Sequence, residues 1–206
     1  MSRTSRPHVS PISKKEGFWM NYRAVRRAMS ELKDEERINE LLSVAKVGYL
    51  GLSDEEGTYV VPLNYVWTEN KIYFHGSDQG RKVDAMQTSN RICFTVSEDR
   101  GTITNPTPAD IGTAYTSVMV FGKVRKVESL EESTRALQAL LDKFVPGYFE
   151  RELSEKYVDS YRSSLGSKTT VYRIEPDQIT AKEEVSDLSK IFFPGRKQID
   201  DLKRKD

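Results

Sequence analysis

The stretch VGYLGLSDEEGTYVVPLNYVWTENKIYFHG, residues 47–76, decides the fold. It contains three segments rich in β-branched and aromatic residues, 47–53, 58–67 and 71–76, separated by the short polar sequences DEEG and TEN. Strands joined by turns this short pair antiparallel, because a parallel crossover needs a dozen or more residues. The stretch therefore predicts an antiparallel meander of three strands.

Pro62 lies inside the second of these segments. Proline has no N–H group to donate to a neighbouring strand, so it is confined to the edges and bulges of sheets. Bulges recur beside functional sites because they change the direction of side chains. We therefore expect this strand at an edge or a bulge.

The rest of the chain continues the β pattern, with further strands predicted at 91–97, 114–127 and 168–184, the last of these as one strand or two. Between them, residues 98–113 form a long polar sequence with two prolines, which predicts a loop. The first three strands lack intervening helices, so a doubly wound parallel sheet is excluded. The fold class is mainly β with peripheral helices, and the turn spacing favours a small antiparallel barrel.

Helices are predicted from apolar spacing and capping residues. Asp34 is suited to cap a helix whose buried face carries Ile38, Leu41, Leu42 and Ala45. A two-turn helix is expected from Arg81 to Thr88, and an amphipathic one over 130–145. Further helices are expected over 19–29, which is basic, and over 148–165, which is less regular.

The composition bounds the class of protein. The chain has 206 residues with 32 Lys and Arg against 31 Asp and Glu, so it has no global field to attract nucleic acid or an acidic membrane. One cysteine and two histidines exclude a disulfide framework and a His-rich metal site. No apolar run approaches the roughly 20 residues of a membrane helix, and no secretory signal is found. We expect a cytoplasmic protein with no metal site.

Three regions are expected along the chain. Residues 1–17 are predicted to form a flexible tail and 18–184 a single domain. Residues 185–206 are a charged extension around one apolar group, Ile191-Phe192-Phe193, which is expected to dock on the body or on a partner.

Most catalytic motifs are missing, including a nucleophile elbow, a Walker loop, a Rossmann glycine fingerprint and His-Glu-x-x-His. Cys93 lies between Ile92 and Phe94 in a predicted strand and is interpreted as a packed thiol.

The most suggestive segment is FHGSDQGRK, residues 74–82, which leaves a strand and places Arg81 and Lys82 at a helix start. Free N–H groups and two cations there suit a phosphate, although a solvated helix start explains the pair equally well. His75 ends the strand, and either a structural or a site role fits it.

Four motifs together indicate a family: VPLNYVW (61–67), YFHGSDQGRKVDAM (73–86), RICFTV (91–96) and TSVMVFG (116–122). Over about residues 20–183 the chain resembles flavin-binding split-barrel proteins related to pyridoxamine 5'-phosphate oxidase, and more closely their nitroimidazole-reductase-like branch. The resemblance implies a six-stranded antiparallel split β-barrel that binds FMN in a cleft between the subunits of a homodimer.

The resemblance also implies which residues form the site, by their positions in the family's motifs. Arg81 and Lys82 would hold the FMN phosphate, and His75, Gly76 and Ser77 would flank the ribityl–phosphate region or the ring face. The remaining contacts would come from Pro62, Leu63, Asn64 and Tyr65 along the isoalloxazine ring, Thr95 on the fourth strand, and Ser117 and Val118 from the partner subunit.

The function implied is an FMN-dependent oxidoreductase that passes electrons from NAD(P)H or another donor to a small acceptor, a nitroaromatic for this branch, with His75 as the candidate catalytic residue. The alternative is a non-catalytic flavin- or haem-binding protein on the same fold. A third hypothesis treats Arg23–Arg27 and the tails as a nucleic-acid module. Pyridoxamine 5'-phosphate oxidase activity itself is disfavoured, because Arg173 is not followed by the Arg-x-His of that enzyme.

Overall fold

The computed structural model describes residues 25–162, 169–184 and 187–202. The expected tail 1–17 and the first part of the expected helix 19–29 lie outside these ranges. Within them, no helix combines the length and apolar character needed to cross a membrane.

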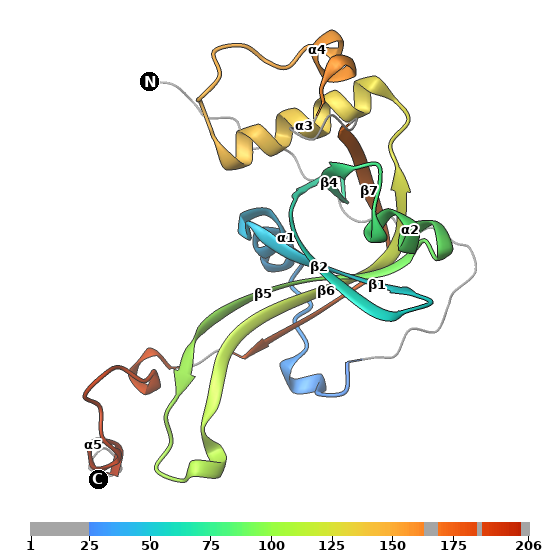
Figure 1. Ribbon diagram of the computed structural model, residues 1–206. Coiled ribbons are helices and arrows are strands. Elements are labelled where there is room, and N and C mark those ends of the chain that lie inside the picture. The colour runs from blue at the N-terminus through green and yellow to red at the C-terminus, as the bar shows by residue number, and fades with distance from the viewer. Residues whose placement is uncertain (1–24, 163–168, 185–186, 203–206) are drawn as a thin grey trace.

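One antiparallel sheet forms the body of the molecule (Figure 1). The described residues contain seven strands, which follow one another in the sheet as β2-β1-β5-β6-β7-β4-β3. Their bounds are β1 Val47–Asp54, β2 Gly57–Asn64, β3 Val66–Thr68, β4 Lys71–Ser77, β5 Arg91–Ile103, β6 Gly112–Lys126 and β7 Thr169–Glu184. The helices are α1 Glu35–Val44, α2 Arg81–Thr88, α3 Leu130–Phe144, α4 Glu155–Ser160 and α5 Gln198–Leu202, with 3-10 turns at Ala28–Ser30, Pro108–Asp110 and Leu188–Lys190.

The two strands at the ends of the sheet are consecutive in the chain, since only Tyr65 separates β2 from β3. The strand β2 pairs with β1, and β3 pairs with β4. The sheet must therefore curl until its two ends meet, which makes a barrel. The structure thus has seven strands rather than six, because the strand expected over 58–67 changes partner at Tyr65. Pro62 lies on an end strand of the sheet, as its missing donor predicts.

The barrel interior is filled by alternate residues of the strands. Ile92, Phe94 and Val96 of β5 are buried, and the residues between them are more exposed. The fully buried Phe94 ring covers Gly48 of the neighbouring strand so closely that a Cβ added there would overlap it.

The long loop expected over 98–113 is largely a hairpin. The strands β5 and β6 continue to Ile103 and from Gly112, and only 104–111 connects them. The sequence concealed this because both strands are polar here and pass through a register shift between Asp99 and Thr102. The hairpin projects from the barrel, and the C-terminal segment 187–202 packs on it (Figure 1). We call residues 99–115 and 187–202 together the arm.

The C-terminal segment is tied to the hairpin by backbone hydrogen bonds. The N–H of Thr104 donates to the carbonyl of Lys190 at 2.7 Å, and that of Phe192 donates to Thr102 at 2.8 Å. Ile191 packs against Gly101 and bridges to Ile103. Of the apolar group in the predicted extension, Ile191 therefore docks on the hairpin of its own chain, whereas the side chains of Phe192 and Phe193 stay exposed.

Three of the predicted helices form where expected. Asp34 caps α1, because its Oδ1 accepts hydrogen bonds from the N–H groups of Glu36 and Arg37 at 2.9 and 3.2 Å. The helices α2 and α3 match their predicted ranges closely.

Two other helix predictions are wrong in extent. Of the helix expected over 148–165, residues 163–165 lie outside the described ranges. In the described part only α4 forms, starting at the cap Ser154, and Tyr148 to Leu153 are not helical. Residues 25–27 are not helical either. The last strand is single.

We predict that Gly48→Ala lowers the free energy of unfolding by about 1–3 kcal/mol, because the new methyl group must displace the rigid Phe94 ring. Urea denaturation followed by circular dichroism measures this. The matched control is Gly112→Ala, whose Cβ would meet only ordinary contacts with Ile103. Equal stability of both variants would contradict the packing described.

Candidate functional site

The candidate site begins where β4 ends. Residues His75, Gly76 and Ser77 pair with the start of β7, opposite Val171, Thr170 and Thr169. The chain then turns through Asp78–Gly80 into α2, and Gly80 takes a φ of +99°, which favours glycine. The structure therefore brings the end of β4 and the start of α2 together, as the sequence predicted.

Lys82 is a half-buried cation beside the backbone of β4. Its Nζ lies only 2.6 Å from the position that a Cβ on Gly76 would take, so the lysine side chain occupies the space that the missing side chain of this glycine leaves open. The ammonium also lies 5.6 Å from the centre of the Phe74 ring. Among the described residues it has no carboxylate partner, and burial lowers its pKa. Lys82 is therefore a desolvated positive charge available to an anion.

Arg81 is engaged in a different way. Its Nε and Nη2 donate to the two carboxylate oxygens of Asp54 at 2.7 and 3.0 Å. Glu56 lies 3.3 Å from Nη1, and the Tyr59 ring lies below the guanidinium at 4.6 Å. The two cations that the sequence treated as a pair thus differ, since Arg81 ties α2 to the β1–β2 turn whereas Lys82 has no acidic partner among the described residues.

His75 stands between Lys82 and a large cavity. The imidazole is exposed at its open side, yet the surrounding protein lowers its pKa, and the charge of Lys82 lowers it further. The ring is therefore neutral at pH 7 and offers one acceptor and one donor nitrogen.

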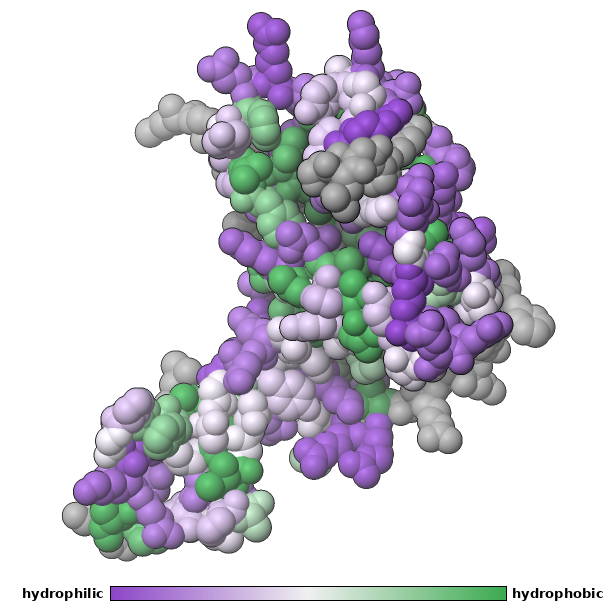
Figure 2. Space-filling model, viewed as in Figure 1, coloured by the Kyte–Doolittle hydropathy of each residue, from purple (hydrophilic) through white to green (hydrophobic). Residues whose placement is uncertain are grey.

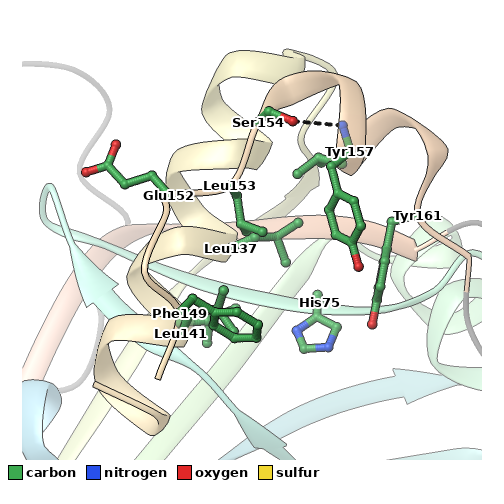
Figure 3. Close-up of a pocket in the computed structure, with 11 residues that line it drawn as sticks. His75, Leu137, Leu141, Phe149, Glu152, Leu153, Ser154, Tyr157 and Tyr161 are labelled. Carbon is green, nitrogen blue, oxygen red and sulfur yellow. Dashed lines mark hydrogen bonds between the residues drawn. The ribbon is translucent and has the colours of Figure 1, made fainter. Parts of the chain in front are cut away.

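The cavity has a volume of about 520 Å³ and lies under α3 and α4 (Figure 3). That volume is within the usual range of small-molecule sites. The Tyr157 and Tyr161 rings point from α4 toward His75, whereas the Glu152 carboxylate points away (Figure 3). The lining is mostly apolar, and the described residues in it include no Lys or Arg: His75, Leu137, Leu140, Leu141, Phe149, Glu152, Leu153, Ser154, Tyr157, Val158 and Tyr161.

Sequence reasoning missed this cavity wall because it comes from the irregular segment 148–161. One signal was available in the sequence, because this segment holds more aromatic residues than a single surface helix needs. They are Tyr148, Phe149, Tyr157 and Tyr161.

The other predicted cofactor contacts lie on other strands. Pro62 and Asn64 are exposed on β2, and Leu63 is half-buried against the core. Tyr65 is fully buried, so none of its surface is open to a ligand in the single chain.

The remaining contacts lie on β5 and β6, away from β4 in the order of the sheet. Thr95 and Ser117 are half-buried on the outer face, whereas Val118 is fully buried in the core.

Arg173 is fully occupied by acidic partners. Its Nη1 donates to both oxygens of Glu132 on α3 at 3.1 and 2.8 Å, and its Nε donates to Glu175 at 2.9 Å. The Tyr73 hydroxyl also donates to Glu132 at 2.9 Å. This network joins α3 to the barrel. Within the described ranges, no group of three His, Cys, Asp or Glu side chains is suited to hold a metal ion.

A curled antiparallel sheet whose end strands are consecutive in the chain, with a helix leaving the end of β4, defines a split β-barrel. The family model described as pyridoxamine 5'-phosphate oxidase matches residues 34–183. The chain belongs to this family. No curated protein matches the sequence.

Solved structures with the same fold include flavin- and haem-binding proteins. A putative 5-nitroimidazole antibiotic resistance protein from Bacteroides thetaiotaomicron is 27% identical, with a TM-score of 0.57 over 74% of this chain and 85% of that one. The flavocytochrome Anf3 from Azotobacter vinelandii is 21% identical, with a TM-score of 0.67 over 84% and 79%. An FAD- and haem-binding protein from Mycobacterium smegmatis is 18% identical, with a TM-score of 0.64 over 76% and 74%.

We predict that Lys82→Gln raises the pKa of His75, because the substitution removes a nearby positive charge that disfavours imidazolium. NMR titration of the imidazole protons measures the shift, in a His8→Gln background that leaves one histidine signal. Arg81→Gln is the control, since its charge is already paired with Asp54. A His75 pKa that responds equally to both variants would contradict this electrostatic assignment.

Proposed function

We propose that this chain is a flavoprotein oxidoreductase that binds FMN at the end of β4 and reduces a small acceptor in the cavity under α3 and α4. The observation that carries the proposal is Lys82, a half-buried cation without an acidic partner in the described structure, whose ammonium lies against Gly76 at the end of β4.

The residues around Lys82 fit a flavin phosphate. The helix α2 begins there without a side-chain cap, so its first N–H groups are open to an anion. Lys82 supplies a charge-assisted contact, and Ser77 contributes a hydroxyl close to the same turn. For Arg81 to join them, it must exchange its Asp54 carboxylate for the phosphate.

The outer face of the sheet fits a second copy of the chain. A row of side chains crosses four of its strands, with Pro62 opposite Tyr49, Tyr49 opposite Thr95, and Thr95 opposite Met119. Tyr49 and Met119 are 48% and 38% exposed although both are large and apolar. We propose that two copies pack on this face as a homodimer, which brings Ser117 of each chain toward the cofactor of the other.

The cavity lining favours a neutral planar acceptor. Without Lys or Arg among the wall residues that the structure describes, an anionic ligand would lose its hydration there without a compensating charge. Leucine side chains and the rings of Phe149, Tyr157 and Tyr161 suit an aromatic ligand. A nitroaromatic meets these conditions, and the 27% identical structure carries a nitroimidazole-resistance description.

The roles of the chain's own residues follow from their positions. When bound, FMN would accept electrons from NAD(P)H or another donor and deliver them to the acceptor. His75, neutral at pH 7, is placed to hydrogen-bond a polar group of the acceptor at the boundary between cavity and phosphate site. The apolar wall would exclude water from the acceptor.

A second candidate is a non-catalytic haem- or flavin-binding protein. The observation in its favour is the imidazole of His75 at an apolar cavity, since neutral imidazole is a common axial ligand of haem iron. The absorption spectrum of the purified protein separates the candidates. Flavin bands with FMN released on heating support the first, a Soret band supports the second, and a colourless protein that also fails to bind added FMN overturns both.

We predict that Lys82→Gln weakens FMN binding by at least about tenfold, because a charge-assisted phosphate contact is worth about 1.5–3 kcal/mol. Titration of flavin fluorescence measures the affinity. Arg81→Gln should weaken binding less, since that arginine must first leave Asp54, and Asp54→Asn should strengthen it. Affinity unchanged by Lys82→Gln would refute the phosphate site.

We predict that Leu141→Trp abolishes most turnover of a nitroaromatic acceptor while FMN occupancy is retained, because the indole fills the cavity away from Lys82. Steady-state assays with NAD(P)H and absorbance of bound flavin measure the two effects. Leu130→Trp at the start of α3, outside the cavity lining, is the control. Normal turnover in the filled variant would place the acceptor elsewhere.

A further inference from the structure

The arm carries an exposed apolar surface at the end farthest from the barrel. Phe192 and Phe193 are 52% and 59% exposed. Apolar residues gather on the same lobe, at the lower left of Figure 2. Five large apolar side chains form this surface, which we call the arm patch: Ile111, Phe192, Phe193, Ile199 and Leu202.

The arm patch is held on a fixed scaffold. The Arg196 guanidinium is buried against Asp201, and its Nη1 donates to the carbonyls of Ser189 and Ile191 at 2.6 and 2.9 Å. The Gln198 amide donates to the carbonyl of Pro106 across the hairpin at 2.6 Å. A surface that is ordered before binding loses little conformational entropy on association. The arm patch is therefore suited to bind a partner.

A second apolar surface lies at the other end of the molecule. The residues around the cavity that face solvent include Phe149 and Tyr157, which are 54% and 56% exposed. Figure 1 places α3 and α4 at the opposite end of the barrel from the arm. We call the exposed aromatic residues of the cavity lining the cavity rim: Phe149, Tyr157 and Tyr161. An arm that points away from the rim of its own chain cannot cover it.

The strands β5 and β6 connect the two ends. Both run without a break from the barrel into the arm, so the outer face that carries Met119 continues toward the arm through Ser117 and Thr113. Suppose that two copies pack face to face about a two-fold axis that lies between the two sheets and runs perpendicular to β5 and β6. The strands of one copy then run antiparallel to those of the other. Each arm then extends past its own barrel toward the α3–α4 end of its partner.

We propose that the arm patch of one copy packs on the cavity rim of a second copy and closes its cavity, so that Phe192 and Phe193 contribute to the partner's acceptor site. This inference rests on the homodimer of the proposed function. A second copy is the occupant because each chain carries one patch and one rim, and a two-fold axis satisfies both contacts at once. The cavity, which lies open beside exposed tyrosines in the single chain, then becomes enclosed.

Cross-linking between two single-cysteine chains tests the contact. In a Cys93→Ser background, one chain carries Phe193→Cys and a second, longer by an affinity tag, carries Tyr157→Cys. The two are mixed at micromolar concentration and treated with a short bis-maleimide. Because a contact holds the thiols at a millimolar effective concentration, we expect at least about tenfold more cross-linked heterodimer than from chains that meet at random.

The matched control replaces Tyr157→Cys with Gln87→Cys, on the exposed face of α2. Circular dichroism confirms that each variant folds, and the absorbance of bound flavin is recorded on the same samples. Equal yields at positions 157 and 87, from a protein that is dimeric by sedimentation, would overturn the arm contact while flavin absorbance still supported the proposed function. A monomer at these concentrations would overturn the arm contact together with the homodimer.

Discussion

The burial of Tyr65 is the constraint on which the rest of the structure depends. Its ring lies between β2 and β3, packs edge-on against Phe94 at 5.0 Å and receives the Lys143 ammonium at 4.1 Å. Its hydroxyl donates to the carbonyl of Leu42 at 2.7 Å. One side chain thus joins α1, α3 and the barrel core at the point where the strand changes partner. Burial lowers the pKa of Lys143 to about 8, the cost of placing a cation over this ring.

The barrel closed in this way holds two different environments on either side of His75. On one side, a helix start and the half-buried ammonium of Lys82 favour negative charge. On the other, a wall of leucines and aromatic rings favours an uncharged planar ligand. The imidazole of His75 is positioned at the boundary because β4 ends there, and the pairing of β4 with β7 fixes that end. A cofactor and an acceptor of different charge can therefore meet at one residue.

Much of the barrel and the start of α2 just after β4 followed from the sequence. The alternation of β5, the Asp34 cap and the glycines around α2 are local signals, and the structure agrees with them. The sequence could not separate Arg81 from Lys82, because the partner of Arg81 is Asp54, on a different element. It also missed the hairpin beyond Ser97, whose polar residues show no alternation, and the cavity wall, which only the packing of α4 on α3 creates. These features depend on contacts between residues distant in sequence.

The order of the strands has a consequence for synthesis on the ribosome. The strand β4, which ends at His75, pairs on one side with β3 and on the other with β7, which begins at Thr169. Until that last strand emerges, one edge of β4 has no partner, and β6 also lacks a neighbour on one side. Such non-local pairing is slow to form and leaves strand edges open to other chains. The site is therefore assembled near the end of folding, and a chain that stops before β7 lacks both a closed barrel and a positioned His75.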